Sequence, residues 1–147
     1  MIEFFVSCVP PKTTAQQVGI FKRGDGTMFI AKKGKAEQAK QTLIAVFTPY
    51  KPQRALSGPV RLSITLEWPW RASESKRTRQ SGRIWHTSRP DADNLAKMIQ
   101  DCLAKLCFIE NDAVVSELTV RKFWGDRPGI TIQLAELERV AKGMGVE

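Results

Sequence analysis

The sequence has few of the residues that build zinc sites and disulfide frameworks. Its 147 residues include one histidine, His86, and three cysteines, Cys8, Cys102 and Cys107. No two cysteines form a C-x-x-C pair, so neither a zinc site nor a redox pair is indicated. An odd number of cysteines in apolar surroundings instead predicts buried, reduced thiols in a cytoplasmic protein.

Long apolar runs are also missing. No stretch approaches the roughly 20 apolar residues that span a membrane. The first residues lack the basic and apolar segments of a signal peptide, and the chain has no internal repeat. A chain of 147 residues suits one domain with a normal hydrophobic core. We therefore expect residues 1–147 to form a single domain.

Acidic residues are scarce relative to basic ones. The chain has 23 Lys and Arg against 15 Asp and Glu, which gives a formal net charge of +8. Such a balance favours a polyanionic partner.

One stretch nevertheless gathers carboxylates at an amphipathic segment. Asp91 and Asp93 open this segment, and Asp112 lies in the turn that follows it. Apolar residues recur at steps of three and four, which predicts a helix near 93–106. Asp93 or Asn94 is expected to cap this helix, because a short polar side chain accepts hydrogen bonds from the first turn.

Three convergent carboxylates point to a metal ion. Such groups repel one another unless a cation joins them, and Mg²⁺ prefers oxygen ligands. If the following strand packs beside the helix, Asp112 returns toward Asp91 and Asp93. Lys97 shares a helical stripe with Asp93 and is placed to orient an aspartate or to contact a scissile phosphate. The motif D-x-D-N alone fits a capped helix with ordinary surface charges equally well, but the helix, the third aspartate and the basic context together favour a metal site.

These residues carry a resemblance to a known family. The chain is similar to the core of the RusA-type Holliday junction resolvases, which are crossover junction endodeoxyribonucleases of phages and prophages, in Asp91-Ala92-Asp93-Asn94-Leu95, Lys97, Phe108 and Asn111-Asp112-Ala113. The match is specific over residues 90–122. It departs from the family pattern in a long basic insertion before Asp91 and in Glu110, where an apolar residue is expected.

The resemblance implies both an activity and a site. It implies a homodimeric endonuclease that uses Mg²⁺, with Mn²⁺ as a substitute. By motif, the metal ligands are Asp91, Asp93 and Asp112, and Lys97 is the catalytic lysine.

A basic segment over residues 71–89 leads directly into Asp91. It has no apolar period, so we expect a mobile loop that orders on DNA through salt-sensitive phosphate contacts. The predicted DNA contacts in it are Arg71, Lys76, Arg77, Arg79, Arg83 and Arg89. Trp70 and Trp85 fit packing better than stacking on a base, and His86 fits a packing or solvent-facing role better than a chemical one.

A second basic element is expected near the N-terminus. Asp25-Gly26 between two apolar runs predicts a β-hairpin. Its lysines and arginine, Lys22, Arg23, Lys32 and Lys33, are candidate contacts to the DNA backbone. An exposed basic turn without that role explains them equally well.

The expected fold class is α+β. We expect strands near 2–9, 60–67, 114–123 and 130–135, and helices near 35–48 and 93–106, assembled as a mixed sheet with its helices on one face. The turn cluster 125–129 predicts that the last two strands pair as an antiparallel hairpin. A short helical ending is expected over 135–140.

Together these features predict a Mg²⁺-dependent, structure-specific endonuclease of DNA recombination and repair. A homodimer would place paired, symmetric nicks in a four-way junction, because the junction and the dimer share two-fold symmetry. A nuclease for flaps or forks fits the same residues. A non-catalytic basic DNA-binding protein is the other alternative, although acids on a DNA-facing surface would weaken its binding.

Overall fold

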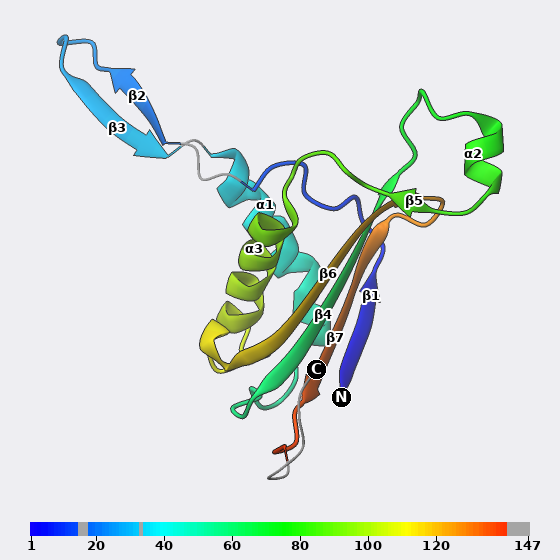
Figure 1. Ribbon diagram of the computed structural model, residues 1–147. Coiled ribbons are helices and arrows are strands. Elements are labelled where there is room, and N and C mark those ends of the chain that lie inside the picture. The colour runs from blue at the N-terminus through cyan, green and yellow to red at the C-terminus, as the bar shows by residue number, and fades with distance from the viewer. Residues whose placement is uncertain (15–17, 33, 141–147) are drawn as a thin grey trace.

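A five-stranded mixed sheet with helices α1 and α3 on one face forms the body of the protein (Figure 1). The computed structural model describes residues 1–14, 18–32 and 34–140, without the side chains of 18–21 and 29–32. The strand order is β1-β7-β4-β6-β5. The bounds of these elements are β1 Ile2–Val6, α1 Lys35–Phe47, β4 Val60–Pro69, β5 Ile84–Trp85, α3 Ala92–Lys105, β6 Val115–Gly125 and β7 Gly129–Glu136. The predicted α+β class is confirmed.

Strand β4 forms the centre of the sheet. Every second side chain of its first half, Val60, Leu62, Ile64 and Leu66, is fully buried. This confirms the strand predicted from apolar alternation. Strand β4 pairs with β7 in antiparallel fashion and with β6 in parallel fashion.

The predicted hairpin of β6 and β7 is wrong, because β4 lies between these two strands. The loop over 126–128 does reverse the chain, as its glycine, aspartate and proline content predicts. The most apolar strand, however, gains a neighbour on both sides when β6 and β7 flank it. A turn signal fixes the reversal of direction, but it does not fix which strand becomes the neighbour.

Helix α3 packs its apolar face into the core and begins earlier than expected. Asp91 is its N-cap residue, with extended backbone, and Ala92 is the first helical residue. The predicted caps Asp93 and Asn94 are therefore wrong. The Asp93 carboxylate instead accepts the adjacent Asn94 amide N–H at 2.9 Å within the first turn.

The end of α3 is closed by two backbone hydrogen bonds. The amide of Phe108 donates to the carbonyl of Leu103 at 2.9 Å, and that of Cys107 donates to Ala104 at 3.0 Å. This is the Schellman pattern, and it places Cys107 at a φ of 60°. Glycine is the residue that adopts this conformation without steric cost.

Cys107→Gly is therefore expected to stabilise the protein. Relief of the left-handed conformation should raise the free energy of unfolding by about 0.5–1 kcal/mol, because the Cys107 side chain that is removed is exposed to solvent. Chemical denaturation measures this change. Cys107→Ala keeps a Cβ atom and serves as the control, and equal stabilities of both variants and the parent chain would contradict the argument.

The three thiols differ in burial. Burial raises the pKa of the Cys102 thiol to about 11 and also raises the pKa of half-buried Cys8. Cys107 is exposed, so the prediction of three buried thiols is wrong at this position. The cause is its place in the turn that ends α3.

The predicted N-terminal hairpin is confirmed. Strands β2 (Val18–Lys22) and β3 (Met28–Lys32) pair in antiparallel fashion as a separate sheet. Figure 1 shows this hairpin projecting away from the five-stranded sheet.

The basic segment 71–89 contains regular structure, contrary to expectation. A short helix, α2 (Lys76–Gln80), is capped by Ser75, whose hydroxyl accepts the amide N–H of Thr78 at 3.1 Å. Strand β5 then pairs with the end of β6. Helix α2 lies away from the sheet in Figure 1, which explains why its sequence has no apolar period.

The short remaining elements complete the fold. Two 3₁₀ turns, η1 (Thr48–Tyr50) and η2 (Asp112–Val114), follow α1 and precede β6. The predicted helical ending over 135–140 is wrong, because β7 continues to Glu136 by pairing with Val60. Among the described residues, no helix is long and apolar enough to cross a membrane.

Candidate active site at the start of helix α3

Two of the predicted metal ligands lie together at the start of α3. Asp91 precedes the helix, Asp93 lies in its first turn, and both are exposed to solvent. The partial positive charge of a helix N-terminus favours carboxylates and anionic ligands at this place. The sequence therefore produces a solvent-facing pair of acids where a cation and a phosphate can approach.

Lys122 of β6 holds the chain that leads into Asp91. Its Nζ donates to the carbonyl oxygens of Ser88 at 2.7 Å and Pro90 at 2.6 Å. Burial lowers the pKa of Lys122, while the charge of Asp91 acts in the opposite direction. Sequence reasoning missed this residue. One sign of it was present in the sequence. Lys122 lies two residues from Val120 and from Trp124, so it is a charged residue on the strand face that is directed toward the helices.

Lys122→Met should destabilise the protein by about 2 kcal/mol, because two carbonyl groups lose a charged donor. Chemical denaturation tests this value. Arg121→Met is the matched control, since Arg121 is the exposed preceding residue of the same strand. Equal stability of the two variants would show that the contacts of Lys122 do not hold this segment.

Asp112 lies at the opposite end of α3. It begins η2, just before β6. Asp91 instead lies near Lys122, seven residues after Val115, the first residue of β6. At about 3.3 Å per residue the strand separates the two acids by about 23 Å. The 14 residues of α3 give about 21 Å by the helical rise.

The expected return of Asp112 toward Asp91 and Asp93 is therefore wrong within one chain. Strand β6 runs antiparallel to α3, so the beginning of the strand meets the end of the helix (Figure 1). In the described part of the chain, no cluster of three or more acids, histidines or cysteines could hold a metal ion. Asp112 remains exposed at its own end of the helix.

Lys97 lies one helical turn after Asp93 on the exposed face of α3. Its side chain is 73% exposed, and its Nζ lies 3.6 Å from Asp101 Oδ1. The stripe of Asp93, Lys97 and Asp101 thus faces away from the core, as its spacing predicts. Lys97 is free to swing toward a ligand at the helix start.

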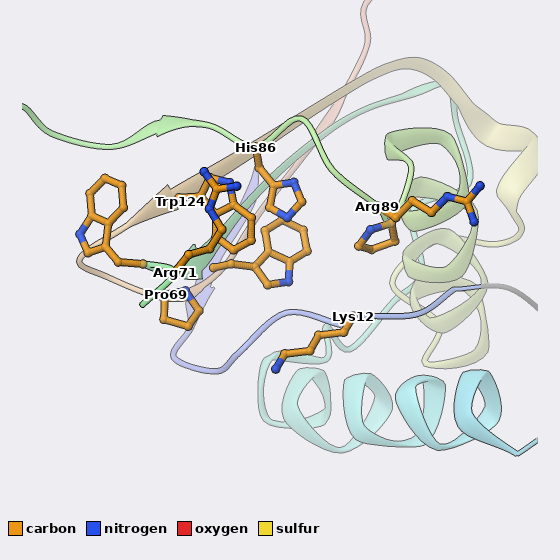
Figure 2. A pocket seen from close by; sticks show the side chains of 9 residues that line it. Lys12, Pro69, Arg71, His86, Arg89 and Trp124 are labelled. Carbon is orange, nitrogen blue, oxygen red and sulfur yellow. The ribbon is translucent and has the colours of Figure 1, made fainter. Parts of the chain in front are cut away.

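Two adjoining cavities lie beside Asp91. The first, of about 270 Å³, is lined by Asp91 and Asn94 together with Lys12, Thr13, Thr14, Arg89 and Pro90. The second, of about 380 Å³, shares Lys12, Arg89 and Pro90 with it. Figure 2 shows Lys12 reaching in from the loop after β1, while the Arg89 guanidinium points away toward the side of α3. The sequence suggested no role for Lys12, whose position beside Asp91 depends on tertiary packing.

Most of the predicted DNA contacts lie on the surface of the protein. Lys76, Arg77 and Arg89 are exposed, as are Lys22 and Arg23 at the end of β2. The side chain of Lys32 and the whole of Lys33 lie outside the described residues. The exposed members therefore offer cations on the hairpin, on α2 and beside Asp91.

Arg71 and Arg83 are exposed as well, and the side chains of Arg71, Arg79 and Arg83 contact other parts of the chain. Arg71 pairs with Glu74, and its guanidinium lies 4.8 Å from the ring centre of Trp124. Arg79 donates to the Arg71 carbonyl at 3.1 Å. Arg83 lies 4.0 Å from the ring of Phe123. These contacts order the basic segment against the sheet.

His86 packs among aromatic rings, as the sequence indicated. It is 6% exposed and stacks on Trp124 at a centroid distance of 4.0 Å. Burial is the largest of the causes that lower the pKa of His86. The positive charge of Lys122 and then that of Arg71 lower it further. Its Nδ1 accepts the amide N–H of Ser88 at 3.2 Å, so the neutral ring carries its proton on Nε2.

The stability of the protein should consequently fall in mild acid. As the pH falls below about 6.5, His86 becomes protonated in the unfolded chain at a higher pH than in the folded chain, where its pKa is lowered. The free energy of unfolding therefore rises with pH through this window, and the contribution is lost as the pH falls through the folded pKa. His86→Phe should flatten the dependence of the denaturation midpoint on pH between about 5 and 7. An unchanged slope in this variant would contradict the assignment.

The fold and the site define a class of protein: an α+β domain that presents two exposed acids at a helix start, beside Lys12, Arg89 and Lys97. The family model of the endodeoxyribonuclease RusA matches residues 9–135. The chain therefore belongs to the RusA endodeoxyribonuclease family, which confirms the resemblance and the enzyme class predicted from the sequence.

Two relatives extend over most of the chain. It is 30% identical over 135 residues to the crossover junction endodeoxyribonuclease rusA of Lactococcus phage r1t, which covers 92% of this chain and 96% of that protein. It is 26% identical over 118 residues to the uncharacterized protein YqaN of Bacillus subtilis (strain 168), covering 77% and 82% of the two chains.

Proposed function

We propose that the protein is a structure-specific DNA endonuclease that resolves Holliday junctions by paired nicks. The observation that carries the proposal is the exposed acid pair Asp91 and Asp93 at a helix start, surrounded by cations in a protein of net charge +8. Family membership and the crossover junction endonuclease among its relatives support the same activity.

Mg²⁺, or Mn²⁺ in its place, fits the residues present. Exposed carboxylates are hard oxygen donors, and they leave room for water and a phosphate. Asp91, Asp93 and Asp112 are the proposed ligands. A bound ion would supply a nucleophilic water at neutral pH and stabilise the charge that develops on the phosphate.

Because Asp112 lies about 20 Å from Asp91 within the chain, we propose that two copies complete the site. Asp91 and Asp93 of one copy would meet Asp112 of the partner subunit. A C2 dimer would then contain two equal sites. That arrangement suits a four-way junction, which also has two-fold symmetry and needs two nicks.

The basic residues would have different roles according to their distance from Asp91. Lys97, one turn from Asp93, would neutralise charge on the scissile phosphate in the transition state. Lys12 and Arg89 line the cavity that contains Asp91 and would hold adjacent phosphates. The hairpin and α2 would contact the DNA arms further away through their exposed cations. Lys32 and Lys33 remain predicted contacts to the DNA backbone.

A panel of labelled DNA substrates tests the proposal. A four-way junction, a flap, a fork and a linear duplex are incubated with Mg²⁺ or with EDTA. Symmetric nicks in the junction alone, lost in EDTA, are the expected result. Equal cutting of the flap or fork would indicate a general branched-DNA nuclease. Tight binding without cutting in Mg²⁺ or Mn²⁺ would leave a DNA-binding protein without catalysis.

A further inference from the structure

An aromatic cavity adjoins the proposed catalytic site. It has a volume of about 380 Å³, and its lining includes Trp68, Trp70, His86, Trp124, Lys12 and Arg71. Figure 2 shows the His86 and Trp124 rings side by side, with Arg71 and Pro69 nearby. Four aromatic rings line this opening together with the cations Lys12 and Arg71, whereas the Arg89 guanidinium points away toward the side of α3.

The rings are held in place before any ligand arrives. Trp68 is 2% exposed and lies 4.6 Å from the His86 ring, which stacks on Trp124. Trp70 is half-buried, and its indole N–H donates to Asp126 at 2.7 Å. A preformed aromatic surface binds a flat ligand without a large cost in side-chain ordering.

The cavity also offers polar groups. His86 uses Nδ1 for the Ser88 amide, so its Nε2–H is the remaining donor of the ring. Among the described residues, this N–H has no acceptor. Arg71, held over Trp124, adds a guanidinium at the edge. Such donors match the carbonyl and ring-nitrogen acceptors of a nucleobase.

The position of the cavity connects it to the acids. Lys12, Arg89 and Pro90 line both this cavity and the one that contains Asp91 and Asn94. A nucleotide whose phosphate lies at Asp91 can therefore extend its base, or that of its neighbour, toward the rings. Aromatic side chains beside cations are how proteins hold unstacked bases.

We propose that this cavity binds one unstacked nucleobase of the branched DNA, next to the phosphate held at Asp91. The inference rests on the proposed function. A base at a branch point has lost part of its stacking, so less free energy is needed to extrude it than a base within a duplex. The cavity would thereby favour cutting at the branch over cutting in the arms.

A thermodynamic cycle between protein and DNA tests the proposal. Each nucleotide that flanks the branch of a dye-labelled four-way junction is replaced in turn by an abasic site. Dissociation constants are measured by fluorescence anisotropy in EDTA for the unmodified protein and for the Trp70→Ala variant. At one position the abasic site should weaken binding by the unmodified protein about tenfold, as loss of one stacked base does. Trp70→Ala should bind the intact junction about tenfold more weakly and should be insensitive to that abasic site.

Two further variants make the result specific. Trp85→Ala removes a tryptophan that is 64% exposed and lies outside the cavity lining, so it should keep the full abasic penalty. Trp70→Leu keeps an apolar side chain without a stacking ring and replaces Trp70→Ala if circular dichroism shows that the latter does not fold. The proposal would be overturned if each abasic site weakened binding equally in the unmodified protein and in the Trp70 variant. If junction cleavage in Mg²⁺ persists in that case, only the base site fails, whereas absence of cleavage contradicts the proposed function itself.

Discussion

Asp112→Asn is expected to lower junction cleavage by at least about a thousandfold, which corresponds to about 4 kcal/mol of transition-state stabilisation. The amide keeps the shape of the side chain but loses the negative charge that a divalent cation requires. Junction binding should be retained or tightened, since one repulsive charge next to the phosphates is removed. Single-turnover cleavage rates and anisotropy measure the two quantities.

The local structure indicates that this variant folds. The N-cap of η2 is Asn111, whose side chain accepts the amide N–H of Ala113 at 2.9 Å, so Asp112 is not the capping residue. Glu110→Gln is the matched control, because it removes an exposed acid two residues earlier and should leave the cleavage rate unchanged. Joint loss of folding and binding in Asp112→Asn would show a structural role instead, and near-normal cleavage would exclude Asp112 from the metal site.

Lys97→Ala is expected to slow cleavage by about a hundredfold, in the range found when one donor to a transition-state oxyanion is removed. Its effect on stability should be small. The ion pair with Asp101, at 3.6 Å, involves a side chain that is 73% exposed, and such pairs contribute about 1 kcal/mol or less.

A lysine on the same helix provides the control for that experiment. Lys105 lies in the last turn of α3 and is exposed, so Lys105→Ala should cut junctions at the normal rate. Lys97→Arg keeps the charge and should recover part of the activity. Equal slowing by Lys97→Ala and Lys105→Ala would indicate a general loss of DNA binding rather than a role at the scissile phosphate.

Local periodicity predicted the elements that carry the site. Helix α3 and strand β4 follow from apolar spacing of three to four and of two, and both are confirmed. The exposed acid pair at the helix start follows from the same pattern, because it fixes which face is buried. Spacing along the chain was therefore sufficient to predict that Asp91, Asp93 and Lys97 are exposed in the first part of one helix.

Non-local packing determined what the sequence could not predict. The order of β4, β6 and β7 depends on which neighbours bury the most apolar strand, and turn residues carry no information on that choice. The distance from Asp91 to Asp112 depends on the direction of β6 relative to α3. The contacts of Lys12 and Lys122 join segments far apart in the chain, so single residue types gave little sign of them.

The basic segment 71–89 illustrates a third limit. Helix α2 has no apolar face, and Ser75 as a cap was its one local signal. Arginines that the sequence assigned to DNA, such as Arg71 and Arg83, also contact aromatic rings of the sheet. Charge counts locate a basic surface, but packing decides which of its cations remain free for a partner.

Mixing two inactive variants tests the shared metal site most directly. Asp91→Asn and Asp112→Asn are each expected to be inactive alone, because each dimer would then have two defective sites. After subunit exchange, a mixed dimer would contain one site with all its acids, if the proposed meeting of Asp91 of one copy with Asp112 of the partner subunit holds. An equal mixture should recover about a quarter of the sites of the unmodified protein and should make single rather than paired nicks. A mixture as inactive as either variant would contradict a site shared between two copies.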